Sequence, residues 1–408
     1  MITVIGLDGS PLTSEAANAI ASASLVVGGR RQLAAVSLMA GARTITLGPL
    51  APALEALGAH RFGDAVVLAS GDPGFFGILR SLRERGLACT VLPAVSSVAL
   101  AFARAGMPWD DAQVVSAHGR DPRHAVNMCR AHPKVAVLTG PGCGPAELGS
   151  ALDGWQRRLV VAEHLAAPDE RITMCSPADA VTRTWQDPNV VLVIADTPPG
   201  AGPGLSWPPA CAPGGWALAE DGFDQRDAVI TKAEVRAVAL ARLAPGPGRL
   251  IWDVGAGTGA VGIECARFGA AVIAVERDPR RSERVRANAV RYGTCLRLVT
   301  GDAPGALAAL PHPDAVFVGG GGPAVVDAVA ARQPGRIVVT LAAVERTGPV
   351  AASLTAAGYA VDGALVHAAR LVPLPGGVHR LGPINPVFVL WGSREAPSHA
   401  AAGREGPP

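Results

Sequence analysis

Short apolar runs alternate with stretches of helical periodicity along most of the chain. The first half contains runs rich in Val, Leu, Ile and Ala, several of which end in Gly, Ser or Asp before a helical pattern begins. We expect strands at residues 2–7, 23–28, 65–71, 89–94, 112–117, 134–140, 158–164 and 189–196. This alternation predicts an α/β domain.

The same alternation starts again after a segment dominated by proline and glycine. Residues 197–215 should hold neither helix nor strand, because proline removes backbone donors and glycine weakens regular structure. Beyond it we expect strands at 248–257, 270–276, 296–303, 314–322, 335–344 and 386–392. The pattern therefore predicts a first domain at 1–196, a linker at 197–215, a second α/β domain at 216–392 and a disordered tail at 393–408.

Composition excludes several classes of protein. The 408 residues allow two or three domains, and a net charge of +2 without charged blocks argues against a nucleic-acid binder. Seven cysteines form no C-x-x-C pair and nine histidines show no ligand spacing, so we expect no metal site. The chain start lacks a basic n-region, and no apolar run reaches the length of a membrane span. We expect a cytoplasmic protein in a reducing compartment that contacts no membrane.

The segment LIWDVGAGTGAVGIE, residues 250–264, has two interpretations. Its glycines let the backbone approach a ligand, and the helix that follows offers free N–H groups. The first interpretation is the G-x-G-x-x-G of a nicotinamide or flavin site, formed by Gly257, Gly259 and Gly262. The second is D-x-G-x-G-x-G, formed by Asp253, Gly255, Gly257 and Gly259.

Three acidic residues, each after its own strand, favour S-adenosylmethionine over a nicotinamide. Asp253 suits the amino group of this cofactor, Glu276 its ribose hydroxyls, and Asp302 its adenine amino group. A nicotinamide-dependent oxidoreductase stays the alternative. The cofactor-binding residues predicted here are Asp253, Gly255, Ala256, Gly257, Thr258, Gly259, Glu276, Arg277, Asp302 and Ala303.

The fourth strand of this domain ends in glycines, Gly319 to Gly322. Methyltransferases that act on exocyclic amines resemble one another in carrying [N/D]-P-P-[Y/F] at this place. Its absence disfavours a nucleic-acid methyltransferase with an appended domain, the other alternative. The glycines form either an open wall for a large flat substrate, with Gly319 beside the cofactor, or a mobile loop.

The motifs ITKAEVRAVALARL, WDVGAGTGAVGIE, AVERDP, GDAPGAL and AVFVGGGG occur in this order from residue 226 to about 392. They resemble the methyltransferase domain of the cobalamin pathway that methylates carbon 15 of a precorrin and decarboxylates it. The resemblance places Thr231 over the cofactor and makes Lys232 a candidate partner for a carboxylate. Thr231 and Glu234 also match a capping box, which is the simpler explanation.

The first domain carries a turn signal in ASGDPGFFGIL, residues 69–79. With VLPAVSSVALAFARAGMPW, SAHGRD and LTGPGCGPAEL it resembles the tetrapyrrole methylases, which bind S-adenosylmethionine between two α/β lobes. The resemblance assigns Gly71, Asp72, Pro73, Ser96 and Ser97 to the cofactor and His118 to the substrate. The first loop, IGLDGSPLT, lacks the family's usual P-G and leaves the role of Asp8 open.

The two domains in this order resemble the precorrin-6Y C(5,15)-methyltransferase (decarboxylating) family. The resemblance implies one S-adenosylmethionine site per domain, a tetrapyrrole substrate, carbon-5 methylation by the first domain and a homo-oligomer through the second. The substrate carboxylates suit arginine forks, and no catalytic base is assigned. Substrate-side candidates are Arg370, His379, Arg380 and Asn385, which flank a Pro/Gly turn that could equally be an ordinary hairpin.

Overall fold

The computed structural model describes residues 1–60, 62–118, 121–196, 215–225 and 230–394. The expected linker and tail lie almost entirely outside these residues. The chain divides into two compact units, of which the first comprises Met1–Arg120, Lys134–Asp153 and Arg157–Asp196. Asp121–Pro133 and Gly154–Gln156 belong to the second unit, together with the chain from Thr197 onward.

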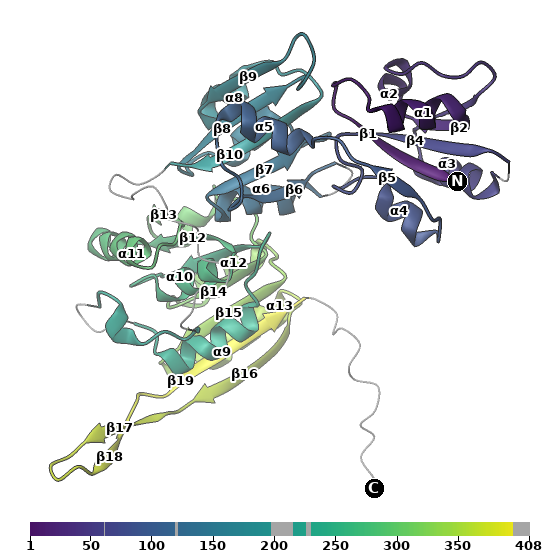
Figure 1. Cartoon of the computed structure of the whole chain (residues 1–408). Helices are drawn as coiled ribbons and strands as arrows, with labels where there is room; N and C mark the ends of the chain where they lie inside the picture. The colour runs from purple at the N-terminus through teal and green to yellow at the C-terminus, as the bar shows by residue number, and fades with distance from the viewer. Residues whose placement is uncertain (61, 119–120, 197–214, 226–229, 395–408) are drawn as a thin grey trace, which may run out of the picture. The chain divides into compact units, whose positions relative to one another are not determined.

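The first unit begins with a parallel five-stranded sheet of order β3-β2-β4-β1-β5 (Figure 1). Its strands are β1 (Ile2–Leu7), β2 (Ala23–Gly28), β3 (Arg43–Thr46), β4 (Asp64–Ser70) and β5 (Thr90–Leu92). Its helices are α1 (Ser14–Ser22), α2 (Arg30–Ala34), α3 (Leu50–Ala59) and α4 (Leu79–Glu84). Apolar side chains of α1 and α2 pack on one face and those of α3 and α4 on the other, so the central strands β1, β2 and β4 are buried on both sides.

A second, mixed sheet of order β6-β7-β10-β8-β9 completes the first unit. Its strands are β6 (Gln113–Ser116), β7 (Lys134–Leu138), β8 (Arg157–Glu163), β9 (Arg171–Cys175) and β10 (Asn189–Ala195). The helices that accompany it are α5 (Ser97–Ala105), α7 (Pro145–Ala151) and α8 (Pro177–Thr182). Helix α5 buries Val98, Ala101 and Phe102 against this sheet, so the turn before it links the two lobes.

The second unit is built on a seven-stranded sheet of order β13-β12-β11-β14-β15-β19-β16. Its strands are β11 (Leu250–Val254), β12 (Ala271–Glu276), β13 (Arg297–Thr300), β14 (Ala315–Val318), β15 (Arg336–Leu341), β16 (Ala360–Val366) and β19 (Val387–Ser393). The first five in the order are parallel, and β19 runs antiparallel to both neighbours. The order of strands reverses between β11 and β14, the place where open α/β sheets bind ligands.

Helices cover both faces of this sheet (Figure 1). The helices are α6 (Pro122–Ala131), α9 (Ala233–Leu243), α10 (Ala260–Arg267), α11 (Pro279–Arg291), α12 (Pro323–Ala331) and α13 (Thr347–Ala356), with 3-10 turns η1 (Glu220–Gly222), η2 (Gly305–Leu307) and η3 (Val344–Arg346). Helices α9 and α10 pack on one face, and α12 and α13 on the other. No described helix combines the length and apolar character needed to cross a membrane.

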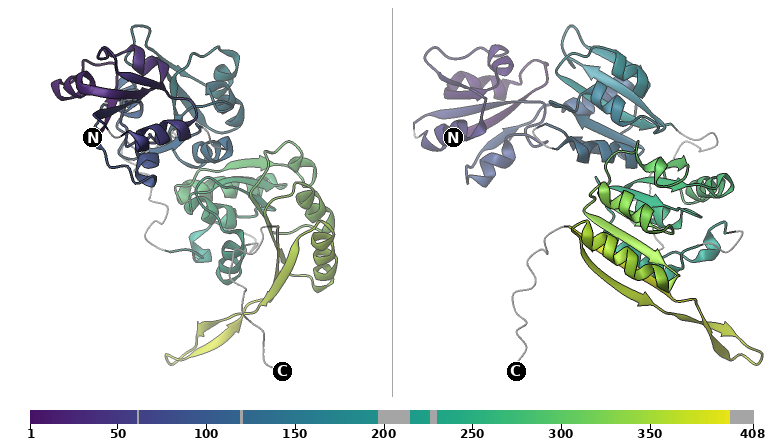
Figure 2. Two further views of the ribbon diagram at one scale, coloured as in Figure 1. Left: turned by 90° about the vertical axis from the view of Figure 1, so that its right-hand side faces the viewer. Right: turned by 180° about the vertical axis from the view of Figure 1, so that it is seen from behind.

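A two-stranded hairpin, β17 (Ala369–Pro373) and β18 (His379–Pro383), extends from the seven-stranded sheet (Figures 1 and 2). Several of its large apolar side chains are exposed, among them Leu371 at 70% and Leu381 at 66%. The α/β fold class is confirmed, and every expected strand is present. The strands that the apolar pattern missed are β3, β9, β16, β17 and β18. Their residues are mostly exposed or half-buried, so these strands carry no continuous apolar run.

Candidate functional site

The turn between β11 and α10 depends on glycine at three places. Gly255, Gly257 and Gly259 have φ of 76°, 60° and 78°, in the left-handed region that side chains rarely adopt. The N–H groups of Gly255 and Ala256 both bind the carbonyl of Val275, which ties the turn to β12. The alternating glycines are therefore required by the backbone, as the D-x-G-x-G-x-G interpretation expects.

Asp253 is buried behind this turn. Its Oδ2 accepts the N–H of Gly262 at 2.8 Å, near the start of α10, where the N-cap Gly259 has no side chain to offer. Burial raises the pKa of Asp253 to about 7. Its Oδ1 is buried and has no hydrogen-bond partner within the described residues. A carboxylate with one unused oxygen behind an open glycine turn fits a cofactor that brings a positive charge.

Gly262, the third glycine of the G-x-G-x-x-G interpretation, has a different reason to be glycine. A Cβ there would lie 2.9 Å from Oδ2 of Asp253 and 3.1 Å from Cγ1 of Val272. The glycine makes room for the carboxylate. Gly257 and Gly259 are thus explained by their positive φ, and Gly262 by the space that Asp253 needs.

The other predicted cofactor residues gather at the same edge of the sheet. Glu276 ends β12 and accepts the N–H of Gly257 at 2.8 Å, while Gly301, just before Asp302, donates to the carbonyl of Glu276 at 3.0 Å. Gly319 follows β14, and a Cβ there would lie 3.1 Å from the carbonyl oxygen of Gly255. The remaining predictions lie on these loops: Thr258 buried, Ala303 half-buried and Arg277 exposed.

The expected capping box at Thr231 and Glu234 is wrong. The N-cap of α9 is Lys232, whose side chain makes no cap hydrogen bond. The N–H of Ala233 is instead bound at 2.7 Å by Oε1 of Glu220. The carbonyl of Thr231 accepts from the buried Arg236, so tertiary contacts rather than local capping hold this turn.

The substrate-side candidates of the second domain do not form one cluster. Arg370 lies at the base of the hairpin and pairs with Glu220 and Glu234 at 2.6 and 2.7 Å. His379 and Arg380 lie on β18 and Asn385 follows it, all exposed. The hairpin that the Pro/Gly turn allowed is present.

In the first unit, three loops meet after β1, β4 and β5. Gly71 has φ of 59°, and a Cβ there would lie 3.1 Å from Cα of Ser96. A Cβ at Gly6 would overlap with the carbonyl of Gly71 and lie 2.7 Å from the N of Ala94. The loops approach so closely that their glycines cannot be replaced without movement.

Asp8 joins two of these loops. Its Oδ1 accepts from Ser10, and its Oδ2 accepts the N–H of Val95 at 3.2 Å. The bonds from Ser10 and Val95 hold the pKa of Asp8 below its usual value. The structure gives this residue a role in joining loops.

A cavity of about 480 Å³ opens beside these loops, between the two lobes of the first unit. Asp8 and Gly71 line it from the first lobe, and Ser97 of α5, Thr139 and Ala162 line it from the second. Its volume is typical of a small-molecule site. Of the predicted cofactor residues, Gly71 and Ser97 line the cavity. Ser96 caps α5 instead, and Asp72 accepts the N–H of Gly74 in the turn that contains Pro73.

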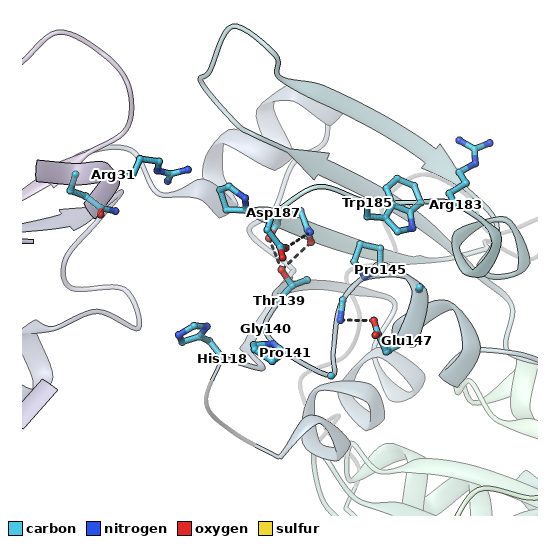
Figure 3. A pocket seen from close by; sticks show the side chains of 16 residues that line it. Arg31, His118, Thr139, Gly140, Pro141, Pro145, Glu147, Arg183, Trp185 and Asp187 are labelled. Atoms are coloured by element: carbon cyan, nitrogen blue, oxygen red, sulfur yellow. Dashed lines mark hydrogen bonds between the residues drawn. The ribbon is translucent and has the colours of Figure 1, made fainter. Parts of the chain in front are cut away.

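A larger cavity of about 840 Å³ adjoins the first (Figure 3). His118, the substrate-side candidate of this domain, is among its lining residues. Arg31 lies at one side and Trp185 and Arg183 at the other, with Thr139 between them. No motif in the sequence pointed to these two arginines or to Trp185, because the cavity brings them together only after the lobes have folded. The two cavities share Arg31, Gln32, Thr139, Pro188 and Asn189, so they form one continuous site.

Comparison with known proteins finds a matching family for each half of the chain. A model of the tetrapyrrole (corrin/porphyrin) methylases matches residues 4–180, and a model of the precorrin methyltransferase domain matches residues 222–392. A Salmonella typhimurium protein named cobalt-precorrin-7 C(5)-methyltransferase is 33% identical, covering 47% of this chain and 98% of its own. A Pyrobaculum calidifontis protein named "Probable cobalt-precorrin-6B C(15)-methyltransferase (decarboxylating)" is 35% identical, covering 46% and 98%.

One relative spans most of both domains. It comes from Sinorhizobium sp, is named precorrin-6Y C(5,15)-methyltransferase (decarboxylating), and is 39% identical over 79% of this chain and 78% of its own. Identity at this level over two fused folds is far more specific than either motif set alone. The protein therefore belongs to the family of precorrin-6Y C(5,15)-methyltransferases (decarboxylating).

Proposed function

We propose that this protein methylates precorrin-6Y, or its reduced form precorrin-6B, at carbons 5 and 15 and removes carbon dioxide from an acetate side chain, giving precorrin-8X in cobalamin biosynthesis. The observation that carries the proposal is the presence of two separate sites on one chain. One is the glycine edge of the second unit, and the other is the double cavity of the first. Each suits one S-adenosylmethionine.

The second domain is proposed to methylate carbon 15 and decarboxylate, and the first to methylate carbon 5. The names of two relatives support this division, since each covers about half of this chain and carries one of the two activities. Both domains transfer a methyl group to a ring carbon, and the second also removes carbon dioxide. Which carbon is methylated therefore depends on how each domain orients the substrate against its cofactor.

In the second domain, Asp253 is assigned to the amino group of S-adenosylmethionine and Glu276 to the ribose, since both acids lie beside the glycine turn. The cofactor supplies an electrophilic methyl group, so an electron-rich ring carbon can attack without a protein nucleophile. The protein's part is to align the reacting atoms. Gly319 to Gly322 leave a wall without side chains beside Gly255, where a flat macrocycle can approach.

Loss of carbon dioxide leaves an electron pair that must be accepted. The macrocycle, positively charged after methylation, can take this pair into its conjugated system. The protein need only hold the acetate arm in place, and we assign no general base.

In the first domain, the larger cavity offers groups that suit a tetrapyrrole with many carboxylates. Arg31 and Arg183 can each bind a carboxylate as a fork, and Trp185 offers a flat face to the macrocycle. His118 lies at the same cavity, as the family resemblance implied. The smaller cavity with Gly71 and Ser97 would hold the cofactor.

We propose a homo-oligomer that forms through the second domain. The hairpin supports it, since Leu371, Val378 and Leu381 are 70%, 58% and 66% exposed on a segment that packs on no core. We also propose that the protein works in the cytoplasm. The six cysteines found among the described residues are all free thiols, which fits a reducing compartment.

Mass spectrometry of the tetrapyrrole product tests the function. The purified chain is incubated with S-adenosylmethionine and precorrin-6Y or precorrin-6B. We expect a product that gains two methyl groups and loses one carbon dioxide. A folded protein that binds the cofactor yet leaves both substrates unchanged would refute the proposal.

A further inference from the structure

One ionic cluster of the second unit joins three segments that lie far apart in sequence. Arg370 of β17 donates through Nη1 and Nη2 to both oxygens of Glu220, at 2.6 and 2.8 Å. It donates through Nε and Nη2 to both oxygens of Glu234, at 2.9 and 2.7 Å. A single guanidinium thus holds two carboxylates, each by both oxygens, a geometry that only arginine provides.

The cluster is more than a surface ion pair. Glu220 is buried, and its hydrogen bonds from Arg370 lower its pKa to about 2. The same carboxylate binds the N–H of Ala233 at the start of α9. An isolated exposed pair would contribute little, but here the arginine of the hairpin fixes the carboxylate that in turn fixes a helix start.

No described residue next to the start of α9 caps this helix, so its first N–H depends on the cluster. A helix leaves its first N–H groups free, and the N-cap Lys232 supplies no side-chain bond. Glu234 could have capped the helix but is bound to Arg370. The turn at Thr231 and Lys232 is therefore held on one side by Arg236 and on the other by the Arg370 cluster.

We propose that Arg370 is a positioning residue of the second domain, which holds the Thr231–Lys232 turn in place for S-adenosylmethionine through Glu220 and Glu234. This inference rests on the proposed function and on the resemblance, which places Thr231 over the cofactor. In the structure Ile230, just before this turn, shares a buried cluster with Ala260 and Ile263 at the start of α10, the helix that follows the glycine turn. It replaces the expected role of Arg370 as a fork for substrate carboxylates, because all the nitrogens of its guanidinium are engaged. The hairpin base and the cofactor site are thereby mechanically connected.

The test compares R370A with R370K and with R286A, which removes an exposed arginine paired with Glu283 in the same domain. Carbon dioxide release is measured against S-adenosylmethionine concentration, because only the second domain is proposed to decarboxylate. We expect R370A to raise the KM for S-adenosylmethionine about tenfold, as for the loss of one charged hydrogen bond, with kcat little changed. R370K should recover part of this loss, and R286A should match the wild type.

A second measurement follows the helix start directly. Hydrogen exchange of the peptide that contains Ala233 should be faster in R370A than in the wild type and unchanged in R286A. If R370A does not fold, E234Q removes half of the cluster and should raise the same KM to a smaller extent.

The outcomes separate this inference from the proposed function. A wild type that releases no carbon dioxide would refute the function itself. With an active wild type, an unchanged KM in R370A would overturn the inference. A loss in kcat alone would also overturn it, since that result belongs to a residue that touches the reacting substrate.

Discussion

Glu264 and Arg236 form a buried ion pair whose loss should destabilise the second domain strongly. Their side chains are 1% and 0% exposed, and Nε of Arg236 lies 2.7 Å from Oε1 of Glu264. Glu264 also accepts the N–H groups of Ala217 and Leu218 at 2.5 and 3.2 Å. The carboxylate therefore satisfies three donors at once, of which the guanidinium of Arg236 is fully buried.

The variant E264Q keeps the size of the side chain but removes its charge and turns one acceptor into a donor. An arginine left buried without its partner costs about 3–5 kcal/mol. For a domain of this size, 1 kcal/mol shifts the Tm by about 2–4 °C. We expect the unfolding transition of the second domain to fall by roughly 6–20 °C.

Calorimetry of the whole chain measures this shift, because it separates the transitions of the two domains. E283Q is the matched control, since Glu283 pairs with Arg286 at the surface and should change the Tm little. The double variant R236M/E264L removes both charges but also leaves the N–H groups of Ala217 and Leu218 without their acceptor, so it should recover only part of the loss. A decrease below about 1 kcal/mol in E264Q would refute the argument.

Three further predictions concern the two sites. The pKa of Asp253 is about 7 in the folded protein and 3.8 in the unfolded chain. Between these two pH values only the folded state binds the proton, so stability falls as the pH rises. Urea titrations at pH 5 and pH 8 measure how much unfolding free energy the protein loses between these pH values. In D253N this loss should be about 3 kcal/mol smaller than in the wild type, and an equal loss in both proteins would contradict the raised pKa of Asp253. G71A should abolish carbon-5 methylation and leave decarboxylation intact, giving a product with one new methyl group by mass spectrometry, because φ is 59° there. W185A should raise the KM for the precorrin about tenfold in carbon-5 methylation and leave the KM for carbon-15 methylation unchanged. An equal increase in both KM values would exclude a substrate contact of Trp185 in the first domain.

Much of the fold could be predicted from the local pattern of apolar and polar residues. Strands buried on both faces, such as β11 and β12, appear as continuous apolar runs because every side chain there meets a helix. The exposed β16, β17 and β18 were missed for the opposite reason: their residues face solvent and carry no such run. Burial, rather than strand formation as such, is what leaves a signal in the sequence.

The conformation of the glycine turn in the second domain was also predictable. Positive φ at Gly255, Gly257 and Gly259 is a local demand of the backbone, and only glycine meets it readily. The acids Glu276 and Asp302 follow strands that are parallel, so the sheet itself brings them to one edge. A short motif and the geometry of a parallel sheet were sufficient for this prediction.

Contacts between distant segments were decided only by the tertiary structure. Glu234 matched a local capping box, yet it binds Arg370, which is 136 residues away. Arg31 and Trp185 reach one cavity from different lobes. Spacing along the chain determines glycine turns and buried strands because their causes are local. The partners of a long charged side chain depend on which surfaces meet, and that is known only once the sheets and helices have packed.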